Sequence, residues 1–227
     1  RVLKIIDRNL CKVVGEIVKK DNKFTIMPDE DRLKINISID ADKINGAVEG
    51  SKVVVRILDQ SSNTNYRGEV IEVLGHRDDP GVDILSIARK YDIEDKFPEE
   101  VIEQLKSIPD HVEESEMVGR LDLRNEIIFT IDGADTKDID DAVSIEKLDN
   151  GNYKLGVHIA DVSYYVKQDS PLDVCAMSRG TSVYLVDRVI PMLPHQLSNG
   201  ICSLNEGVDR LAISCIMEID SSSKIVN

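Results

Sequence analysis

The sequence of 227 residues predicts a mixed α/β protein with a small five-stranded β-barrel, a short helical linker and an incomplete α+β domain. Three observations predict this organisation. Strand-like segments alternate with polar turns in residues 1–78, an acidic stretch with helical spacing occupies residues 79–119, and strand-like segments return in residues 120–227. We therefore assign these ranges to a first domain, a linker and a second domain.

Five segments of the first domain have the composition of strands. Polar turns separate them, among them Asp21-Asn22 and QSSNTN at residues 60–65. A five-stranded closed barrel of this size is typical of oligonucleotide-binding (OB) folds, although other small barrels give the same pattern. The five segments are KVVGEIVKK, KFTIMP, KINISID, KVVVRILD and YRGEVIEVLG.

The sequence of the linker predicts two short acidic helices. In DDPGVDILSIARKY the apolar residues recur at helical spacing after Pro80, and in FPEEVIEQLKSIPD the helix opens at Pro98 with two glutamates in its first turn. We interpret the acidic charge of this segment as a solvated helical face in preference to a functional surface.

The second domain begins with EIIFTID, which predicts an apolar strand leading into a cluster of aspartates. DAVSIEKL and YKLGVHIADVSYYV predict a hairpin-like pair of strands. A helix is expected from Pro171 to a stop at Gly180. TSVYLV, RVIPMLP and RLAISCIMEID then predict further strands.

The formal net charge of −14 alone argues against a nucleic-acid-binding protein, but this charge is uneven. Residues 1–75 contain 13 basic and 12 acidic side chains, whereas residues 76–119 contain 5 and 13, and residues 120–227 contain 10 and 17. The first third of the chain is therefore free to bind a polyanion.

Four widely spaced cysteines form no C-x-x-C pair, so we expect reduced, mostly buried thiols in a cytoplasmic protein without a disulfide framework or a zinc site. No apolar run predicts a membrane span or a signal peptide. Because the chain lacks an initiating Met and stops after SSSKIVN, we expect a piece of a longer protein. The cysteines are Cys11, Cys175, Cys202 and Cys215.

The segment TIDGADTKDIDDAVSI, at residues 130–145, places five aspartates beside one lysine. Crowded carboxylates repel one another unless a positive charge lies among them. Asp132 ends the predicted strand, and a loop of this length can return Asp138, Asp140 and Asp141 to it. Hard divalent cations prefer such oxygen ligands, and two ions about 3.5–4 Å apart can hold the attacking and leaving oxygens of a phosphoryl transfer.

Three other interpretations of this cluster are possible. An EF-hand calcium loop starting at Asp138 fails, because Ala142, Val143 and Asp149 stand at ligand or glycine positions. Helix capping explains one aspartate but not four. A solvated acidic turn stays open beside metal-dependent phosphoryl chemistry, although the flanking apolar segments predict that the cluster lies at the edge of a core.

The same segment closely resembles the first signature of the RNB exoribonucleases, the ribonuclease II and ribonuclease R family. That signature has one Asp, five intervening residues and then D-x-D-D, and all four positions match. GVHIADVSYYV and RGTSVYLVDRVIPMLPHQLSNGICSLN also resemble this family, most closely bacterial ribonuclease R. The barrel region resembles the second cold-shock domain that precedes the RNB domain, so the resemblance covers almost the whole chain.

The resemblance implies an Mg²⁺-dependent, processive 3′-to-5′ exoribonuclease that hydrolyses single-stranded RNA to nucleoside 5′-monophosphates. It implies that Asp132 and Asp141 are direct or near-direct Mg²⁺ ligands, that Asp138 supports the site, and that catalysis depends most on Asp140. The expected reaction is an in-line displacement without a covalent intermediate. The resemblance also implies no organic cofactor, no membrane partner and a monomeric parent protein.

Two further residues match RNA-contacting positions of the family. Tyr184 matches an aromatic residue that stacks on a base, and its alternative is core packing in a strand. Arg179 is a candidate phosphate contact, and its alternative is a cation at a helix C-terminus. His158 is interpreted as a core histidine and His195 as a loop residue, and neither is expected to bind metal. Asp161 is expected either to support the site or to form a turn.

The chain ends before the further catalytic Arg and Glu residues and the S1 domain of the family, so we expect this fragment to be inactive. Two alternatives remain open: a non-catalytic RNA-binding or regulatory module that uses the OB-like barrel, and a structural acidic metal-binding domain.

Overall fold

A computed structural model describes residues 10–20, 23–30, 32–60 and 64–227. The predicted turn at Asp21-Asn22 and the centre of the predicted turn at 60–65 lie outside these ranges. The described chain divides into two compact units. The first unit contains the residues up to Asp95 together with Tyr184–Arg188, and the second contains Lys96–Val183 and Val189–Asn227. The division falls inside the segment predicted as a linker.

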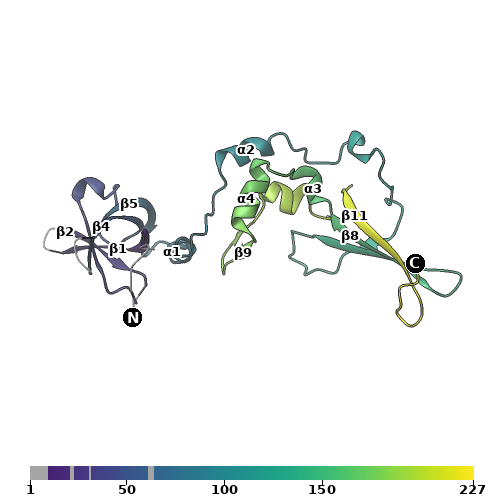
Figure 1. Ribbon diagram of the computed structural model, residues 1–227, viewed down its shortest axis with the longest axis horizontal. Coiled ribbons are helices and arrows are strands. Elements are labelled where there is room, and N and C mark those ends of the chain that lie inside the picture. Colours follow the sequence, from purple (N-terminus) through teal and green to yellow (C-terminus); the bar gives the residue numbers. More distant parts are fainter. Residues whose placement is uncertain (1–9, 21–22, 31, 61–63) are drawn as a thin grey trace, which may run out of the picture. The chain divides into compact units, whose positions relative to one another are not determined.

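The first unit is a closed β-barrel of five strands, as predicted (Figure 1). The strand order is β1-β2-β3-β5-β4, and β4 pairs with β1 to close the barrel. All pairs are antiparallel except β3 with β5, which is parallel. The strands are β1 (Lys12–Lys20), β2 (Lys23–Pro28), β3 (Asn36–Ile39), β4 (Ser51–Gln60) and β5 (Asn65–His76), and a 3₁₀ turn, η1 (Ala41–Lys43), follows β3.

β-branched side chains fill the barrel, because the aromatic residues are few. Ile17, Ile37 and Val53 are fully buried within it. Gly15 allows β1 to lie close against β2, since a Cβ at this position would stand 2.5 Å from the Met27 carbonyl oxygen. The barrel therefore requires glycine at this point of β1.

Helix α1 (Val82–Lys90) confirms the first predicted helix and begins after Gly81, which has a φ of +79°. Its Arg89 is buried, and its Nε donates a hydrogen bond to Glu72 Oε2 at 2.8 Å. A second bond joins Arg89 Nη2 to Asp95 Oδ1 at 2.5 Å. The bond to Glu72 fastens α1 to β5, and the bond to Asp95 holds the segment that follows the helix.

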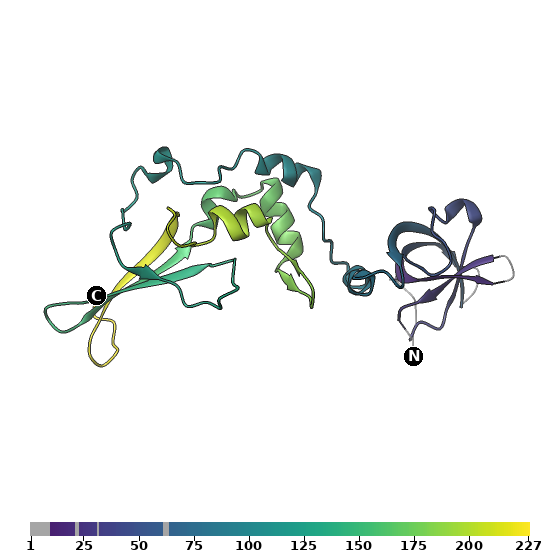
Figure 2. The same cartoon turned by 180° about the vertical axis from the view of Figure 1, so that it is seen from behind.

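The second unit contains a helical group built on one apolar core. Val101, Leu172, Leu197 and Ile201 are all nearly inaccessible to solvent. Figure 1 and, from the opposite side, Figure 2 show α2, α4 and the helical segment η3 close together. The helical elements are α2 (Glu99–Leu105), η2 (Glu114–Met117), α3 (Val162–Tyr165), α4 (Pro171–Arg179) and η3 (Gln196–Ile201), a π-helical segment that the sequence did not predict.

A four-stranded antiparallel sheet of order β11-β8-β7-β6 lies in the same unit. β7, β8 and β11 confirm three predicted strands. β8 ends at Ala160, however, whereas the predicted strand continued to Val166. The residues after Asp161 form the short helix α3 instead. The strands are β6 (Ile128–Phe129), β7 (Asp141–Lys147), β8 (Tyr153–Ala160) and β11 (Ala212–Ile219), while β9 (Val183–Tyr184) and β10 (Val189–Ile190) pair separately.

The strand predicted in EIIFTID is much shorter than expected and is not buried. β6 covers only two residues at the edge of the sheet, and Ile127 and Ile131 on either side are 83% and 86% exposed. The expectation that apolar strands place the aspartates at the edge of a core is therefore wrong on this side. Only β7, which begins at Asp141, connects the cluster to the interior of the sheet.

The cysteine prediction is partly wrong. All four thiols are free of disulfides, but Cys11 and Cys215 are exposed and only Cys202 is buried. Burial raises the pKa of Cys202 to about 11. None of the helices in the described ranges combines the length and the apolar character that crossing a bilayer requires.

Candidate functional site

The predicted aspartates lie on one loop between β6 and β7. The loop turns at Gly133, whose carbonyl accepts a hydrogen bond from Thr136 N at 3.0 Å. It ends at Asp141, the first residue of β7, which pairs with Ile159 of β8. The Asp140 carbonyl accepts a bond from Ala160 N at 2.9 Å, which fixes the last turn of the loop to the end of β8.

The loop brings the carboxylates of Asp132, Asp138 and Asp141 within electrostatic reach of the Asp140 carboxylate. Partial burial, and then the negative charges of Asp138, Asp141 and Asp132, raise the pKa of Asp140 above its usual range. In the described part of the chain, no Lys or Arg side chain forms an ion pair with Asp132, Asp140 or Asp141. The negative charges of this loop act on the Asp140 carboxylate from three neighbouring positions.

These side chains fit a hard divalent cation through their chemistry and charge. All four offer carboxylate oxygens, the ligands that Mg²⁺ prefers. No group of three or more His, Cys, Asp or Glu side chains within the described residues lies close enough to hold one ion together. Mg²⁺ commonly takes one or two protein carboxylates and completes its shell with water and substrate phosphates.

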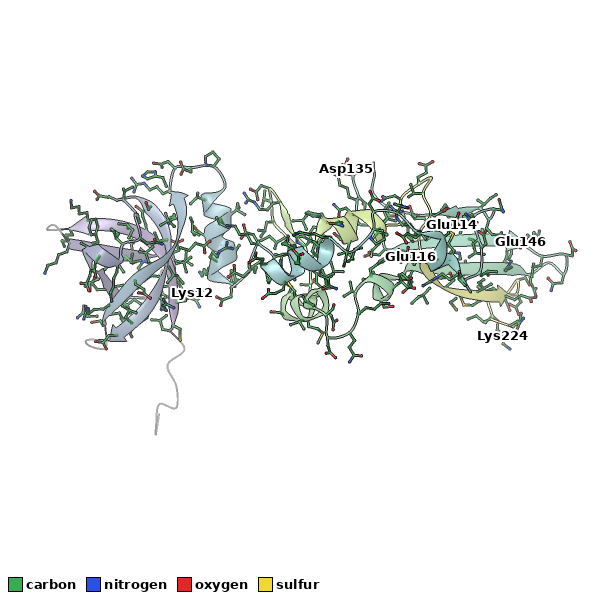
Figure 3. The ribbon with its side chains drawn as sticks, turned by 90° about the horizontal axis from the view of Figure 1, so that it is seen from above. Lys12, Glu114, Glu116, Asp135, Glu146 and Lys224 are labelled. Atoms are coloured by element: carbon green, nitrogen blue, oxygen red, sulfur yellow. The ribbon has the colours of Figure 1, made fainter. Side chains whose placement is uncertain are left out.

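Asp135 differs from the other four aspartates. It is exposed and projects outward from the loop (Figure 3). It does not contribute to the pKa shift of Asp140. This placement makes Asp135 a matched control for substitutions of the other aspartates.

The backbone of the loop forms hydrogen bonds with Ser203 and Leu204. Ser203 Oγ donates to the Lys137 carbonyl at 2.8 Å and accepts from Ile139 N at 3.0 Å. Leu204 N donates to the Ile139 carbonyl at 2.8 Å. Sequence reasoning assigned no role to Ser203, because nothing in its local pattern indicates a partner more than sixty residues away.

Asp161 lies beyond the end of β8 in an ion pair. Arg120 Nη2 donates to its carboxylate at 2.7 Å, and Ser163 Oγ donates to it at 2.9 Å. Burial pushes the pKa of Asp161 upward, but the bonds from Arg120 and Ser163 outweigh this effect, so the pKa falls below its usual value. The Arg120 guanidinium also lies over the Tyr164 ring, 5.1 Å from its centroid. Asp161 therefore fastens the turn after β8.

The two residues predicted to contact RNA have different surroundings. Tyr184 lies in β9 with 66% of its surface exposed, which leaves its ring accessible, and it is grouped with the first unit. Arg179, at the end of α4, donates to the carbonyls of Lys96 and Pro191 at 2.7 and 3.2 Å, and it lies over the Phe97 ring. These contacts give Arg179 a structural role, and its assignment as a phosphate contact stays a prediction that they do not support.

His158 is a core histidine, as interpreted from the sequence, because it is 3% exposed. Its two ring nitrogens form hydrogen bonds with Ser144 Oγ at 3.0 Å and Ser214 Oγ at 2.7 Å, joining three strands of the sheet. Burial lowers the pKa of His158. His195 is exposed and belongs to no group that could hold a metal in the described ranges.

Many basic side chains of the barrel form ion pairs within the first unit. Lys52 contacts Asp29 at 2.6 Å, and Arg67 contacts Asp40 at 2.7 Å. Lys19, Lys20 and Lys23 near the β1–β2 connection form no ion pair with a described residue. All three side chains are exposed, and Lys19 also lies over the Phe24 ring, 5.7 Å from its centroid.

Two family models match the chain. A model of the cold shock domain matches residues 26–98, and a model of the RNB domain matches residues 120–227. The RNB match contains the aspartate loop, and the cold shock match contains β3, β4, β5, α1 and the last residues of β2.

Curated relatives align with most or all of the chain. Ribonuclease R of Thermotoga maritima is 49% identical over 229 residues, which cover 100% of this chain and 32% of the relative. Ribonuclease R 1 of Lactococcus lactis is 52% identical over 80% of this chain and 23% of the relative. Ribonuclease R of Escherichia coli is 40% identical over 99% of this chain and 28% of the relative. The chain spans a third or less of the length of these relatives.

Solved structures show the same fold. Mycoplasma genitalium RNase R in complex with double-stranded RNA matches with a TM-score of 0.90 and 29% identity over 100% of this chain and 40% of that chain. The same enzyme with ribose-methylated single-stranded RNA matches with a TM-score of 0.88 and 28% identity over 99% of this chain and 36% of that one. Yeast Ssd1, a pseudonuclease, matches with a TM-score of 0.70 at 20% identity over 98% and 29%, which shows the fold alone.

Proposed function

This chain belongs to the RNB family and carries the cold shock and RNB domains of ribonuclease R, and from this premise we propose that it forms the RNA-binding barrel and the metal-binding loop of an exoribonuclease. The proposed reaction is Mg²⁺-dependent, processive 3′-to-5′ hydrolysis of single-stranded RNA that releases nucleoside 5′-monophosphates. The single observation that carries the proposal is the loop of four carboxylates between β6 and β7, where partial burial and then the charges of the other three raise the pKa of Asp140.

The aspartates favour catalysis over simple binding of RNA. A surface that only binds RNA gains affinity from cations that contact phosphates. Asp132, Asp138 and Asp141 instead surround Asp140 with negative charge and would repel a phosphate in the absence of a metal ion. This arrangement is useful where a divalent ion joins the carboxylates to the substrate.

Each aspartate has a distinct role in the proposal. Asp132 and Asp141, at opposite ends of the loop, are the proposed Mg²⁺ ligands, and Asp138 supports them. Bound Mg²⁺ would supply Lewis-acid stabilisation of the charge that develops on the phosphoryl oxygens. Asp140, whose carboxylate has the raised pKa, is the group that orients the attacking water or a second ion. Water is the nucleophile, so no covalent intermediate with the protein forms.

The RNA is proposed to contact residues on the first unit. The exposed ring of Tyr184 is suited to stacking on a base, an interaction worth about 1–3 kcal/mol per base. Similar RNase R structures contain double-stranded RNA or ribose-methylated single-stranded RNA, which supports RNA as the ligand of this chain. We also propose that the whole protein acts as a cytoplasmic monomer without an organic cofactor, and the absence of disulfides among the four cysteines agrees with a reducing compartment.

The test is hydrolysis of a 5′-labelled single-stranded RNA by the full-length protein that contains these residues. Asp140→Asn is expected to reduce the rate constant of hydrolysis by a factor on the order of 10²–10³ or more, because it removes a charged group from the reaction centre. RNA binding, measured by fluorescence anisotropy in EDTA, is expected to persist. Mass spectrometry of the products identifies 5′-monophosphates, and a blocked 3′ end is expected to protect the RNA.

Asp135→Asn is the matched control, since Asp135 lies on the same loop but outside the carboxylate group. It is expected to keep the wild-type rate. Wild-type turnover in Asp140→Asn would overturn the catalytic assignment.

A non-catalytic RNA-binding module is the second candidate function. The closed barrel with the exposed Lys19, Lys20 and Lys23 favours it, because cations that contact phosphates give affinity to a surface that only binds RNA. Persistent RNA binding without any Mg²⁺-dependent hydrolysis by the wild-type full-length protein would identify this alternative.

A further inference from the structure

The aspartate loop must hold several carboxylates near one another. Four carboxylates lie on this one loop, and carboxylates that share a site repel one another, so the loop must hold them in place. Within the described residues, no cation pairs with Asp132, Asp140 or Asp141. The hydrogen bonds of the loop backbone are therefore one means of fixing where these carboxylates lie.

The backbone around Asp138 is held on both sides by one neighbouring segment. Ser203 Oγ donates to the Lys137 carbonyl at 2.8 Å and accepts from Ile139 N at 3.0 Å. Leu204 N donates to the Ile139 carbonyl at 2.8 Å. Three hydrogen bonds thus bracket Asp138, and two of them use the single hydroxyl of Ser203.

Ser203 is itself held rigidly. Its side chain is completely buried, and its carbonyl accepts a hydrogen bond from Arg210 Nε at 2.9 Å. Its amide donates to the Gly200 carbonyl at 3.0 Å. The preceding helix η3 is fixed in the core by Leu197 and Ile201, which are 0% and 1% exposed. A hydroxyl on such a support can impose its position on the loop.

From this geometry we propose that Ser203 is a positioning residue for the metal site: its buried hydroxyl clamps the peptides on both sides of Asp138 and so sets the spacing of the four carboxylates. This inference rests on the proposed function. Ser203 touches neither metal nor substrate, and it acts only through the backbone at residues 137–139.

Removing the hydroxyl is expected to weaken metal binding more than RNA binding. In Ser203→Ala, the Lys137 carbonyl and the Ile139 amide lose their partner, and repulsion between the carboxylates opens the loop. We expect the Mg²⁺ concentration for half-maximal activity of the full-length protein to rise by about tenfold and kcat to fall by about tenfold or more, with the dissociation constant for RNA in EDTA unchanged.

Hydrogen exchange is a second measurement, and it reports on the hydrogen bonds of Ser203 without an activity assay. In the 227-residue chain, hydrogen exchange of the Ile139 amide is expected to accelerate by about tenfold or more in Ser203→Ala, because this amide donates to Ser203 Oγ. Ser203→Thr keeps the hydroxyl and is expected to restore protection and the Mg²⁺ requirement. If Ser203→Ala does not fold, Ser203→Cys replaces it, since its thiol is of similar size but hydrogen-bonds weakly.

Ser86→Ala is the matched control for loss of a buried hydroxyl. Ser86 Oγ donates to the Val82 carbonyl at 2.8 Å inside α1, in the other unit. It is expected to leave the Mg²⁺ requirement, kcat and Ile139 exchange at wild-type values.

The outcomes separate the two proposals. If Asp140→Asn retains activity, the proposed function fails, whatever Ser203 does. If Asp140→Asn is inactive but Ser203→Ala keeps the wild-type Mg²⁺ requirement or the wild-type protection of Ile139, the positioning role of Ser203 is overturned and the proposed function stands.

Discussion

At the scale of single residues, the sequence predicted the four carboxylates of the loop but not the hydroxyl of Ser203 that binds its backbone. The spacing of Asp132, Asp138, Asp140 and Asp141 predicts a shared site because all four lie within one short loop. The hydroxyl of Ser203 reaches the same loop from a distant part of the chain, and a hydrogen bond to a backbone group requires no particular side chain at residues 137 or 139. A contact of this kind has no local pattern by which it could be predicted.

His158 gives a prediction about stability and pH. Burial lowers its pKa in the folded protein below the ordinary value of about 6.5 that we expect after unfolding. The unfolded state therefore binds more protons in this range, so stability is complete above the unfolded pKa and decreases as the pH falls toward the folded pKa. The loss amounts to at most about 1.4 kcal/mol for each pH unit between the two pKa values.

The measurement is the free energy of unfolding in urea between pH 8 and pH 5, followed by backbone NMR signals of β8. His158→Gln keeps hydrogen-bonding groups toward Ser144 and Ser214 but cannot titrate, so its stability is expected to fall less over this range. His195→Gln, which changes an exposed histidine, should keep the wild-type pH dependence. Equal pH dependence in wild type and His158→Gln would contradict the prediction.

At the scale of elements, α4 shows a local signal that predicts structure well. Ser170 caps the helix by accepting a hydrogen bond from Asp173 N, and Pro171 stands at its first position. Ser170→Ala is expected to reduce the free energy of unfolding by about 1 kcal/mol, because the amide of Asp173 loses its partner. Urea denaturation of the second unit measures this loss.

Ser178→Ala serves as the comparison within the same helix. Ser178 is exposed near the C-terminal end of α4, and its substitution is expected to change stability by less than about 0.5 kcal/mol. A loss in Ser178→Ala as large as that in Ser170→Ala would show that the cap is not the cause.

The elements that were predicted correctly share strong local patterns, whereas the errors occur where distant contacts decide. Alternating segments and polar turns predicted all five barrel strands, and Pro98 and Pro171 marked the beginnings of α2 and α4. β8 ended early because Asp161 pairs with Arg120, forty-one residues away, and the chain turns there. β6 is short because only two of its apolar residues find partners on β7.

At the scale of the whole molecule, the net charge of −14 predicts a general effect of salt and the aspartate loop predicts a specific one. Screening of the acidic surface should stabilise the chain in any salt. Mg²⁺ that binds the folded loop should add about 1.4 kcal/mol when its concentration is ten times its dissociation constant. Removal of the ion with EDTA should reverse this addition.

The test compares unfolding of the chain in MgCl₂ and in NaCl of equal ionic strength. The extra stabilisation by Mg²⁺ is expected in wild type and in Asp135→Asn, and it should be absent when Asp132 and Asp140 are both changed to Asn. The same response in all three proteins would assign the effect to ionic strength alone.

The clamp at Ser203 also has a consequence during synthesis. A ribosome makes the aspartate loop more than sixty residues before it makes Ser203, and domains generally form from the N-terminus as the chain emerges. A nascent chain can therefore complete its barrel while the metal loop still lacks its inner support. Under the proposed function, the carboxylates of the aspartate loop therefore gain this support only after Ser203 has been made.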